Sequence, residues 1–160
     1  MITFRPAQES DQKYLIEWLL QPGVLDGFPL TDLREIEDAA RIWMGFSKIG
    51  SVLMAEKDGV PCGTAVLYIQ PYKKLAHQCL LAIILDEKLR GHGIGTKLMT
   101  ELMTLAKTKF HIELLHLEVY EHNRAIHLYE RMGFQKYGFQ KHFVKDQGRY
   151  IGKILMQRTL

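Results

Sequence analysis

The chain has 160 residues, of which 47% are hydrophobic and 24% are charged, and its formal net charge is +3 at pH 7. This globular composition excludes a disordered or fibrous chain, and the length suits a single domain over residues 1–160. The small, dispersed charge argues against a nucleic-acid partner. Two cysteines, no apolar leader after Met1 and no apolar run of about twenty residues predict a cytoplasmic protein without a membrane partner.

The first part of the chain predicts one strand, two helices and the beginning of a sheet. Alternation before Pro6 is typical of a strand, and Ser10 with Asp11 can cap a first helix. Thr31 or Asp32 can cap a second helix. The expected elements are a strand at 2–5, helices at about 11–20 and 32–46, and strands at 51–57 and 60–72.

The rest of the chain predicts two strand–helix units followed by a closing hairpin. The expected elements are strands at 77–85 and 112–120, helices at about 93–110 and 123–132, and hairpin strands at 134–144 and 149–158. This order predicts a mixed sheet of about seven strands flanked by about four helices.

Three alternating glycines separate the central strand from the helix that follows it. The glycines are Gly91, Gly93 and Gly95. They leave room for an anion to approach the backbone, where the unpaired N–H groups and the dipole of the helix favour negative charge. Cationic groups stand at the same end: Arg90, His92 and Lys97. The pattern favours a phosphate-bearing ligand, although a turn without a ligand can look the same.

Two known glycine motifs do not fit this turn. A dinucleotide fingerprint requires glycine where the chain has Thr96, and a Walker A motif requires Gly-Lys-Ser/Thr where the chain has Gly-Thr-Lys at 95–97. The order Arg-x-x-Gly-x-Gly, formed by Arg90, Gly93 and Gly95, resembles the GNAT N-acetyltransferases. In that family the turn grips the pyrophosphate of acetyl-CoA.

A second stretch, residues 117–134, strengthens the resemblance. Ala125-Ile126 and the downstream Leu-Tyr and Gly-Phe pairs match the family pattern, in which an asparagine contacts the cofactor and a tyrosine lies near its sulfur. The matching residues here are Asn123 and Tyr129. They are six positions apart where seven are expected, which would rotate Asn123 by about 100° if it lay in the helix. Residues 148–156 are similar to the final strand of bacterial ribosomal-protein-acetylating and small-molecule members.

The resemblance implies the GNAT fold, an α/β (α+β) class with a mostly antiparallel central sheet, and an N-acetyltransferase activity. The acetyl group of acetyl-CoA would move to a primary amine by direct transfer in a ternary complex, without a metal. Ile83, Ile84 and Leu85 would line the pantetheine arm. The remaining cofactor contacts would come from Arg90, Gly91, His92, Gly93, Ile94, Gly95, Thr96 and Asn123. The amine could belong to a small molecule, a peptide or a protein N-terminus, and a homodimer is left open.

Three side chains are candidates for proton transfer. The resemblance makes Tyr129 the general acid beside the leaving thiolate. Two residues are alternative bases: Glu118, which alternation places on the strand face opposite Leu117, and His77, at the start of the central strand. Glu118 is equally consistent with a solvated carboxylate, and His77 with a loop histidine that has no role.

Other readings remain open. An acyl-CoA-binding regulatory module without turnover would carry the same glycine turn. A nucleic-acid binder would require a basic face that the linear sequence does not show. The histidines after residue 110 form no His-x-x-x-His pair, so no metal is expected.

Overall fold

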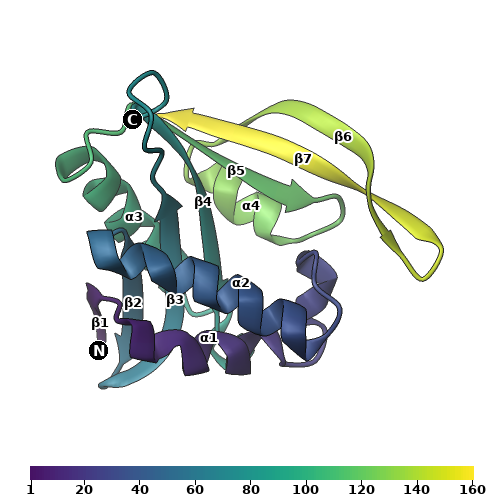
Figure 1. Cartoon of the computed structure of the whole chain (residues 1–160), viewed down its shortest axis with the longest axis horizontal. Helices are drawn as coiled ribbons and strands as arrows, with labels where there is room; N and C mark the ends of the chain where they lie inside the picture. The colour runs from purple at the N-terminus through teal and green to yellow at the C-terminus, as the bar shows by residue number, and fades with distance from the viewer.

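The computed structural model describes all 160 residues and contains one seven-stranded sheet in the order β1-β2-β3-β4-β5-β7-β6 (Figure 1). Neighbouring strands are antiparallel except β4 and β5, which are parallel. The strands are β1 Ile2–Pro6, β2 Val52–Lys57, β3 Val60–Tyr68, β4 Gln78–Leu85, β5 Leu114–Tyr120, β6 Gln135–Asp146 and β7 Arg149–Thr159. The helices are α1 Gln12–Leu19, α2 Leu33–Gly45, α3 Ile94–Thr108 and α4 Ala125–Arg131. The predicted mixed, mostly antiparallel α/β fold is confirmed.

Helices cover both faces of the sheet (Figure 1). Helices α1 and α2 bury Leu15, Trp18 and Ile36 against one face of β2, β3 and β4, because their apolar residues recur at helical spacing. On the other face, α3 and α4 bury Leu98, Leu102 and other apolar side chains against β3, β4, β5 and β7. No helix in the structure has both the length and the apolar character that crossing a bilayer requires.

The predicted strand at 60–72 was too long. Strand β3 ends at Tyr68, and the chain then turns through residues 72–77 before β4 begins. Pro71 has no N–H group to donate to a sheet ladder, and the N–H of Leu75 instead donates to the carbonyl of Tyr72 at 2.9 Å. His77 therefore lies in this loop and not in β4.

Strands β4 and β5 form a fork. They pair only from Gln78 opposite Leu114 to Leu80 opposite His116, and separate beyond that point. The fork is closed at the start of β4, where His116 Nε2 lies 2.5 Å from Gln78 Oε1. Beyond Leu80, the edge of β4 that faces β5 has no strand partner. Its backbone groups are therefore free to pair with an extended ligand.

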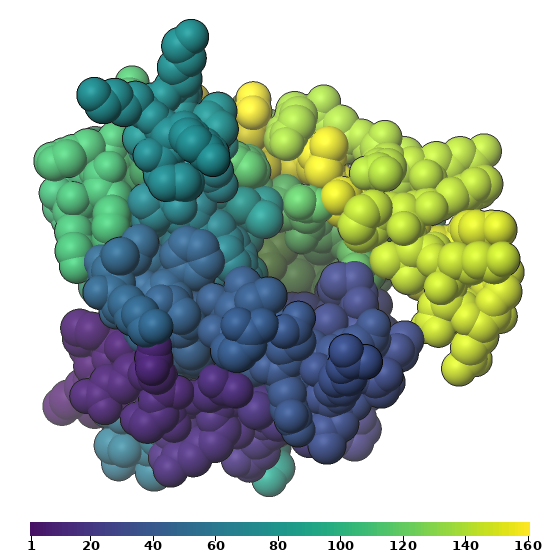
Figure 2. Space-filling view, in the orientation of Figure 1, coloured from purple at the N-terminus to yellow at the C-terminus, as the bar shows by residue number.

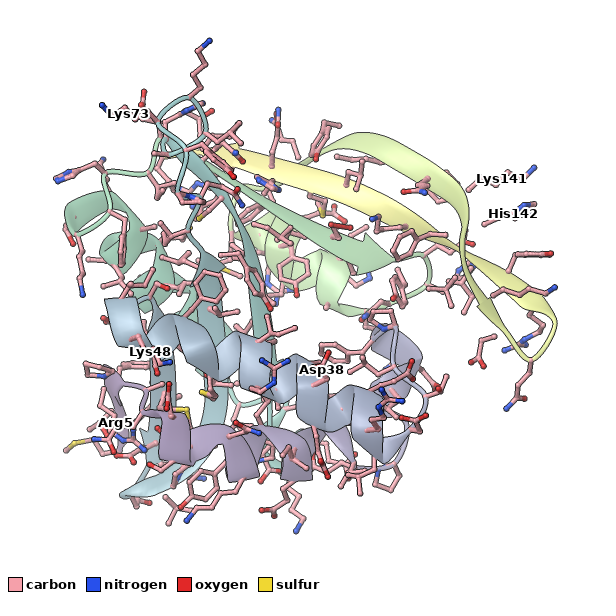
Figure 3. All side chains as sticks on the ribbon, in the orientation of Figure 1. Arg5, Asp38, Lys48, Lys73, Lys141 and His142 are labelled. Carbon is pink, nitrogen blue, oxygen red and sulfur yellow. The ribbon has the colours of Figure 1, made fainter.

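The β6–β7 hairpin projects beyond the body of the sheet (Figure 1). Its register shifts between Lys136 and Gly138 and again between Gln140 and Val144, and such bulges increase strand twist. At the second bulge, Lys141 and His142 point away from the body of the protein (Figure 3). The bulged backbone brings Phe143 across to β7, where it contacts Lys153.

Arg5 joins the first strand to the elements on both sides of it. Its guanidinium donates to both carboxylate oxygens of Asp11, at 2.8 and 2.9 Å, and to Glu56 Oε2 at 2.9 Å. The carboxylate of Asp11 also accepts the N–H of Gln8 at 2.8 Å. These bonds, led by that from Arg5, hold the pKa of Asp11 below its usual value.

We expect Asp11→Asn to lower the free energy of unfolding by about 2 kcal/mol at pH 7, because a charge-assisted, bidentate contact is lost. A lowered folded pKa stabilises the protein above the unfolded value of about 3.9, and this stabilisation is lost as the pH falls through the folded value. The difference from wild type, measured by urea unfolding, should therefore shrink below about pH 4. Glu9→Gln is the control, since Glu9 pairs with Lys48 on the exposed surface and should change stability little. Equal effects of both substitutions would contradict the role of Asp11.

Candidate active site

The turn between β4 and α3 presents unpaired backbone donors to solvent. Gly91 and Gly93 adopt φ angles of 81° and 78°, which L side chains rarely adopt, and Gly93 precedes the first residue of α3. None of the N–H groups of residues 93–96 donates to a protein acceptor; the first helical bond runs from Lys97 N–H to the Gly93 carbonyl. Gly91, His92, Gly93 and Thr96 are exposed. The turn can therefore hold an anion such as a pyrophosphate.

A glutamine that the sequence analysis did not single out supports this turn. Gln21, which follows α1, donates through Nε2 to Asp86 Oδ1 at 2.9 Å and accepts the N–H of Glu87 at 3.0 Å. Asp86 also accepts the N–H of Lys88 at 3.0 Å, and its own N–H donates to the Cys62 carbonyl at 2.8 Å. The segment that follows α1 thus fixes the position of residues 86–88, which lead from β4 into the glycine turn. The linear sequence carries no signal for this contact, which joins residues more than sixty positions apart.

Gly95 allows three elements to meet at the N-terminus of α3. A Cβ atom built on it would lie 3.3 Å from side-chain carbons of both Leu128 on α4 and Leu85 on β4. The absence of a side chain therefore lets the helix approach the end of β4 closely. The three predicted pantetheine-lining residues do not share one face: Ile83 and Leu85 pack with the α3 side, and Ile84 with the α1–α2 side. What they share is the unpaired edge of β4.

Tyr129 lies on α4, on the α3–α4 side of the fork, and only 8% of its surface is exposed. Its ring packs edge-to-face on Phe134, with centroids 6.3 Å apart. Its hydroxyl has no hydrogen-bond partner in the protein. Two other polar atoms without a partner, Trp43 Nε1 and the Tyr120 hydroxyl, are fully enclosed, whereas the Tyr129 hydroxyl is not among these enclosed atoms. Burial raises the pKa of Tyr129 to about 12. The phenol is therefore a neutral donor at physiological pH.

Asn123 lies before α4 and not inside it. Its Oδ1 accepts the N–H of Ala125 at 2.9 Å, and its own N–H donates to the Tyr120 carbonyl at 3.1 Å. The predicted helix start at residue 123 was wrong because this side chain bonds the backbone two residues on, so the helix begins at Ala125. The rotation expected for an asparagine within the helix does not apply. Its amide nitrogen lies beside Gly27, which belongs to the segment of chain that joins α1 to α2.

Glu118 is the first residue beyond the fork point whose side chain lies on the face opposite Leu117 and Val119. We call this the Glu118 face; it is the side of the fork away from Tyr129. Glu118 forms an ion pair with Lys153 of β7, a residue that the sequence analysis did not single out. The Glu118 side chain is 36% exposed and that of Lys153 only 10%. Figure 2 shows a recess between α2 and the hairpin, with green atoms of the β5–α4 region at its floor.

His77 lies apart from these groups. It is exposed in the loop before β4, and its carbonyl accepts the N–H groups of Glu113 and Leu114 at 2.7 and 3.2 Å. It stands at the closed end of the fork, and the eight residues of β4 separate it by roughly 25 Å from the glycine turn. The structure does not bring His77 together with Tyr129 or Glu118.

The family model described as "Acetyltransferase (GNAT) family" matches residues 13–134. The chain belongs to the GNAT family of acetyltransferases. It is 25% identical to the L-amino acid N-acetyltransferase AaaT of Escherichia coli K12 over 108 residues, 67% of each chain.

Two solved structures share the GNAT fold over almost the whole chain. Ribosomal-protein-alanine N-acetyltransferase of Brucella melitensis has a TM-score of 0.83 and 26% identity, and the match covers 99% of both chains. The acetyltransferase yncA of Salmonella typhimurium, solved with its cofactor acetyl-CoA, has a TM-score of 0.82 and 21% identity, and the match covers 99% of this chain and 94% of that one. The predicted family and fold are thus confirmed.

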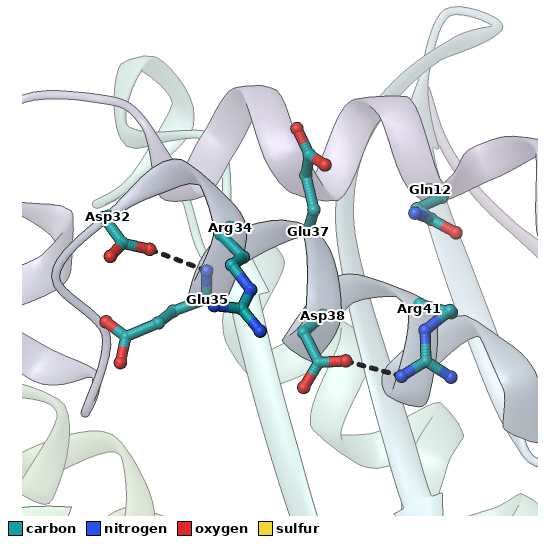
Figure 4. A pocket seen from close by; sticks show the side chains of 7 residues that line it. All are labelled: Gln12, Asp32, Arg34, Glu35, Glu37, Asp38 and Arg41. Atoms are coloured by element: carbon teal, nitrogen blue, oxygen red, sulfur yellow. Dashed lines mark hydrogen bonds and ion pairs between the residues drawn. The ribbon is translucent and has the colours of Figure 1, made fainter.

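A charged hollow on the outer side of α2 lies outside this GNAT site (Figure 4). It is lined by Gln12, Asp32, Arg34, Glu35, Glu37, Asp38 and Arg41. Several of these groups bond one another: Asp32 caps the helix by accepting the N–H of Glu35 at 2.8 Å, and Asp38 pairs with Arg41 at 2.5 Å. No apolar residue lines the hollow, so it resembles a solvated helix face more than a ligand pocket.

Proposed function

We propose that this GNAT protein transfers the acetyl group of acetyl-CoA to a primary amine by direct transfer in a ternary complex. The observation that carries the proposal is the fork itself. A backbone anion cradle stands at the open end of β4, and Tyr129 and Glu118 lie on opposite faces beyond the point where β4 and β5 separate. An acyl donor and an amine can therefore meet from the two sides of the sheet.

The residues present fit acetyl-CoA. The four unpaired N–H groups of residues 93–96 suit its pyrophosphate, and the exposed Arg90 and Lys97 add positive charge. The free edge of β4 suits an extended pantetheine arm and can direct an N–H at the carbonyl oxygen, a contact worth about 2.7–4 kcal/mol in comparable sites. When bound, acetyl-CoA supplies an activated thioester.

Two side chains of this protein would act on the protons of the reaction: one accepts a proton and the other donates a hydrogen bond. Glu118 Oε2 is held by Lys153, so its other oxygen accepts a proton from the incoming ammonium. The Tyr129 hydroxyl donates a hydrogen bond to the sulfur and keeps its proton, because its pKa of about 12 is well above that of a thiol. One C–N bond forms and one C–S bond breaks. The ammonium gives up two protons, one to solvent through Glu118 and one to the departing sulfur.

The cysteines support direct transfer over an acetyl-cysteine route. Cys79 and Cys62 are 0% and 1% exposed. Burial raises the pKa of Cys79 to about 12 and that of Cys62 above its usual value. Neither thiol is an available thiolate at neutral pH, and the thiolate is the nucleophilic form.

The relatives' names suggest α-amines as first acceptors to screen. At pH 7 an α-amine with a pKa near 8 is neutral in roughly one molecule in ten, whereas a lysine amine is neutral in fewer than one in a thousand. A single carboxylate base is a smaller requirement for the α-amine. This argument favours peptide N-termini, and the name of one relative adds free L-amino acids, so these two kinds of amine form the first panel.

The test is release of the CoA thiol from acetyl-CoA, followed with and without each amine, together with the intact mass of the protein. We expect thiol release that depends on the acceptor, an N-acetylated product, and no acetyl group on the protein when the amine is omitted. Acetylated protein in the absence of amine would contradict direct transfer. Binding of acetyl-CoA without turnover of any amine would instead support the regulatory-module alternative.

A further inference from the structure

The Glu118 face carries a largely buried ion pair whose arrangement bears on the kind of amine that the proposed reaction uses. Lys153 lies opposite Tyr120 in the β5–β7 ladder, and Glu118 lies opposite Leu155, so Glu118 and Lys153 are diagonal neighbours on one face. Only 8% of Lys153 is exposed. Few lysines are buried to this degree in folded proteins, and those that are need partners.

Lys153 and Tyr120 together have more hydrogen-bond donors than their surroundings have acceptors. Glu118 is the only acidic partner of Lys153, and the ammonium also lies 3.7 Å from the ring centroid of Phe143. An ammonium has three N–H donors, so two of them lack an oxygen acceptor. The neighbouring Tyr120 is 7% exposed, its ring centroid is 6.1 Å from that of Phe143, and its hydroxyl is buried without a partner. A buried hydroxyl without a partner is costly, and a bound ligand can supply one.

Glu118, the other member of the ion pair, has an unused hydrogen-bond acceptor. Glu118 uses one oxygen for Lys153, so its second oxygen remains free for an ammonium. Of the two residues, Glu118 is the nearer to the fork point, because it lies on β5, whereas Lys153 stands on β7, one strand farther from β4. An amine held by Glu118 would therefore lie toward the fork, and an anionic group held by Lys153 would lie away from it.

We propose that the acceptor is a free α-amino acid bound as its zwitterion, with the ammonium at Glu118 and the carboxylate at Lys153 and the Tyr120 hydroxyl. This inference rests on the proposed acetyl transfer and names its substrate class. A zwitterion matches the ion pair in charge, so its binding leaves no net charge uncompensated. A peptide N-terminus has a neutral amide where the carboxylate should be, so its single carbonyl oxygen offers fewer and weaker hydrogen bonds to Lys153 and Tyr120. A simple alkylamine has no second group at all.

The experiment compares L-leucine, L-phenylalanine and L-methionine with their primary amides, using thiol release from saturating acetyl-CoA. We expect kcat/KM for the best amino acid to exceed that of its amide at least about 100-fold, because the neutral amide cannot form the charge-assisted hydrogen bonds that a carboxylate forms with the buried ammonium. Lys153→Met, which keeps the length of the side chain, should reduce this ratio to below about fivefold, because any effect that it has through Glu118 is common to acid and amide and cancels in the ratio. Tyr120→Phe should lower the ratio in the same direction by less.

Lys145→Met is the matched control. Lys145 belongs to the same hairpin and lies 5.5 Å from the ring centroid of Tyr150, but it is exposed. It should keep the wild-type ratio. Thermal melts establish that each variant is folded, and Lys153→Arg, which keeps the charge, should retain most of the preference if Lys153→Met does not fold.

The outcomes separate this inference from the proposed function. Turnover of amides as fast as of acids by the wild-type protein would overturn the zwitterion site while leaving acetyl transfer intact. If no amine turns over, calorimetric titration of the same acids and amides into the protein–CoA complex shows whether the zwitterion site exists. Binding of acids alone would support the site although the proposed activity fails, and binding of neither would overturn the site as well.

Discussion

Tyr129→Phe should lower kcat by about 100-fold or more while changing the Kd for acetyl-CoA only a few-fold. The hydroxyl is the only polar group of this buried side chain, and it has no partner in the protein, so its removal breaks no internal hydrogen bond. A fixed hydrogen-bond donor that points at the atom where negative charge develops contributes typically about 10²- to 10³-fold to a rate. Steady-state kinetics with an established acceptor, beside a binding titration, measures both effects.

The pH dependence separates this role from an ordinary effect on packing. Burial raises the pKa of Tyr129 to about 12, so the phenol keeps its proton from pH 6 to pH 10 and the loss in the variant should be constant over that range. Tyr14→Phe is the control, because Tyr14 stacks on Trp18 in α1, away from the fork. Full turnover by Tyr129→Phe at every pH would contradict the assigned donor.

Gly93→Val should weaken acetyl-CoA binding by about 100-fold. Gly93 has a φ of 78° and carries the first of the four unpaired N–H groups, so a branched side chain strains the turn and stands in front of the cradle. Loss of two charge-assisted hydrogen bonds costs about 3 kcal/mol, which is a factor of roughly 100 in Kd. Isothermal titration calorimetry measures this change.

Gly59→Val is a closely matched control. Gly59 has a φ of 82° in the β2–β3 turn, is exposed and, like Gly93, has nothing within 4 Å of an added Cβ. Both substitutions should therefore lower the free energy of unfolding by a similar amount, on the order of 1–3 kcal/mol. Only the substitution at residue 93 should reduce affinity. A similar loss of affinity in both variants would mean that backbone strain, and not the cradle, causes it.

Features that depend on short stretches of chain were predictable from the sequence. The glycine turn and the start of α3 at Ile94 follow from local constraints on φ and from unpaired N–H groups, which a run of six or seven residues specifies. The strand order could be expected only through the family resemblance. The overlong strand prediction after Tyr68 shows the reverse case, where Pro71 and the turn beyond it override an apolar pattern.

Features that depend on strand register were not predictable. Glu118 was identified from alternation alone, but its partner Lys153 is thirty-five positions away and meets it only through the β5–β7 register. The approach of Phe143 depends on the second bulge of β6, which no turn residue marks. An isolated lysine between Gly152 and Ile154 in a largely apolar final strand was the one available signal. Similarly, the position of His77 depends on which end of β4 closes the fork.

Hydrogen–deuterium exchange with and without acetyl-CoA tests most directly that this ligand lies in the fork with its pyrophosphate at the glycine turn. The N–H groups of residues 93–96 have no protein acceptor, so they should exchange rapidly in the free protein and slow markedly when the ligand binds. We predict protection concentrated in peptides covering residues 81–97, with the tip of the β6–β7 hairpin unchanged. Protection confined to the charged hollow on α2, or no protection of the turn at saturating acetyl-CoA, would contradict this assignment.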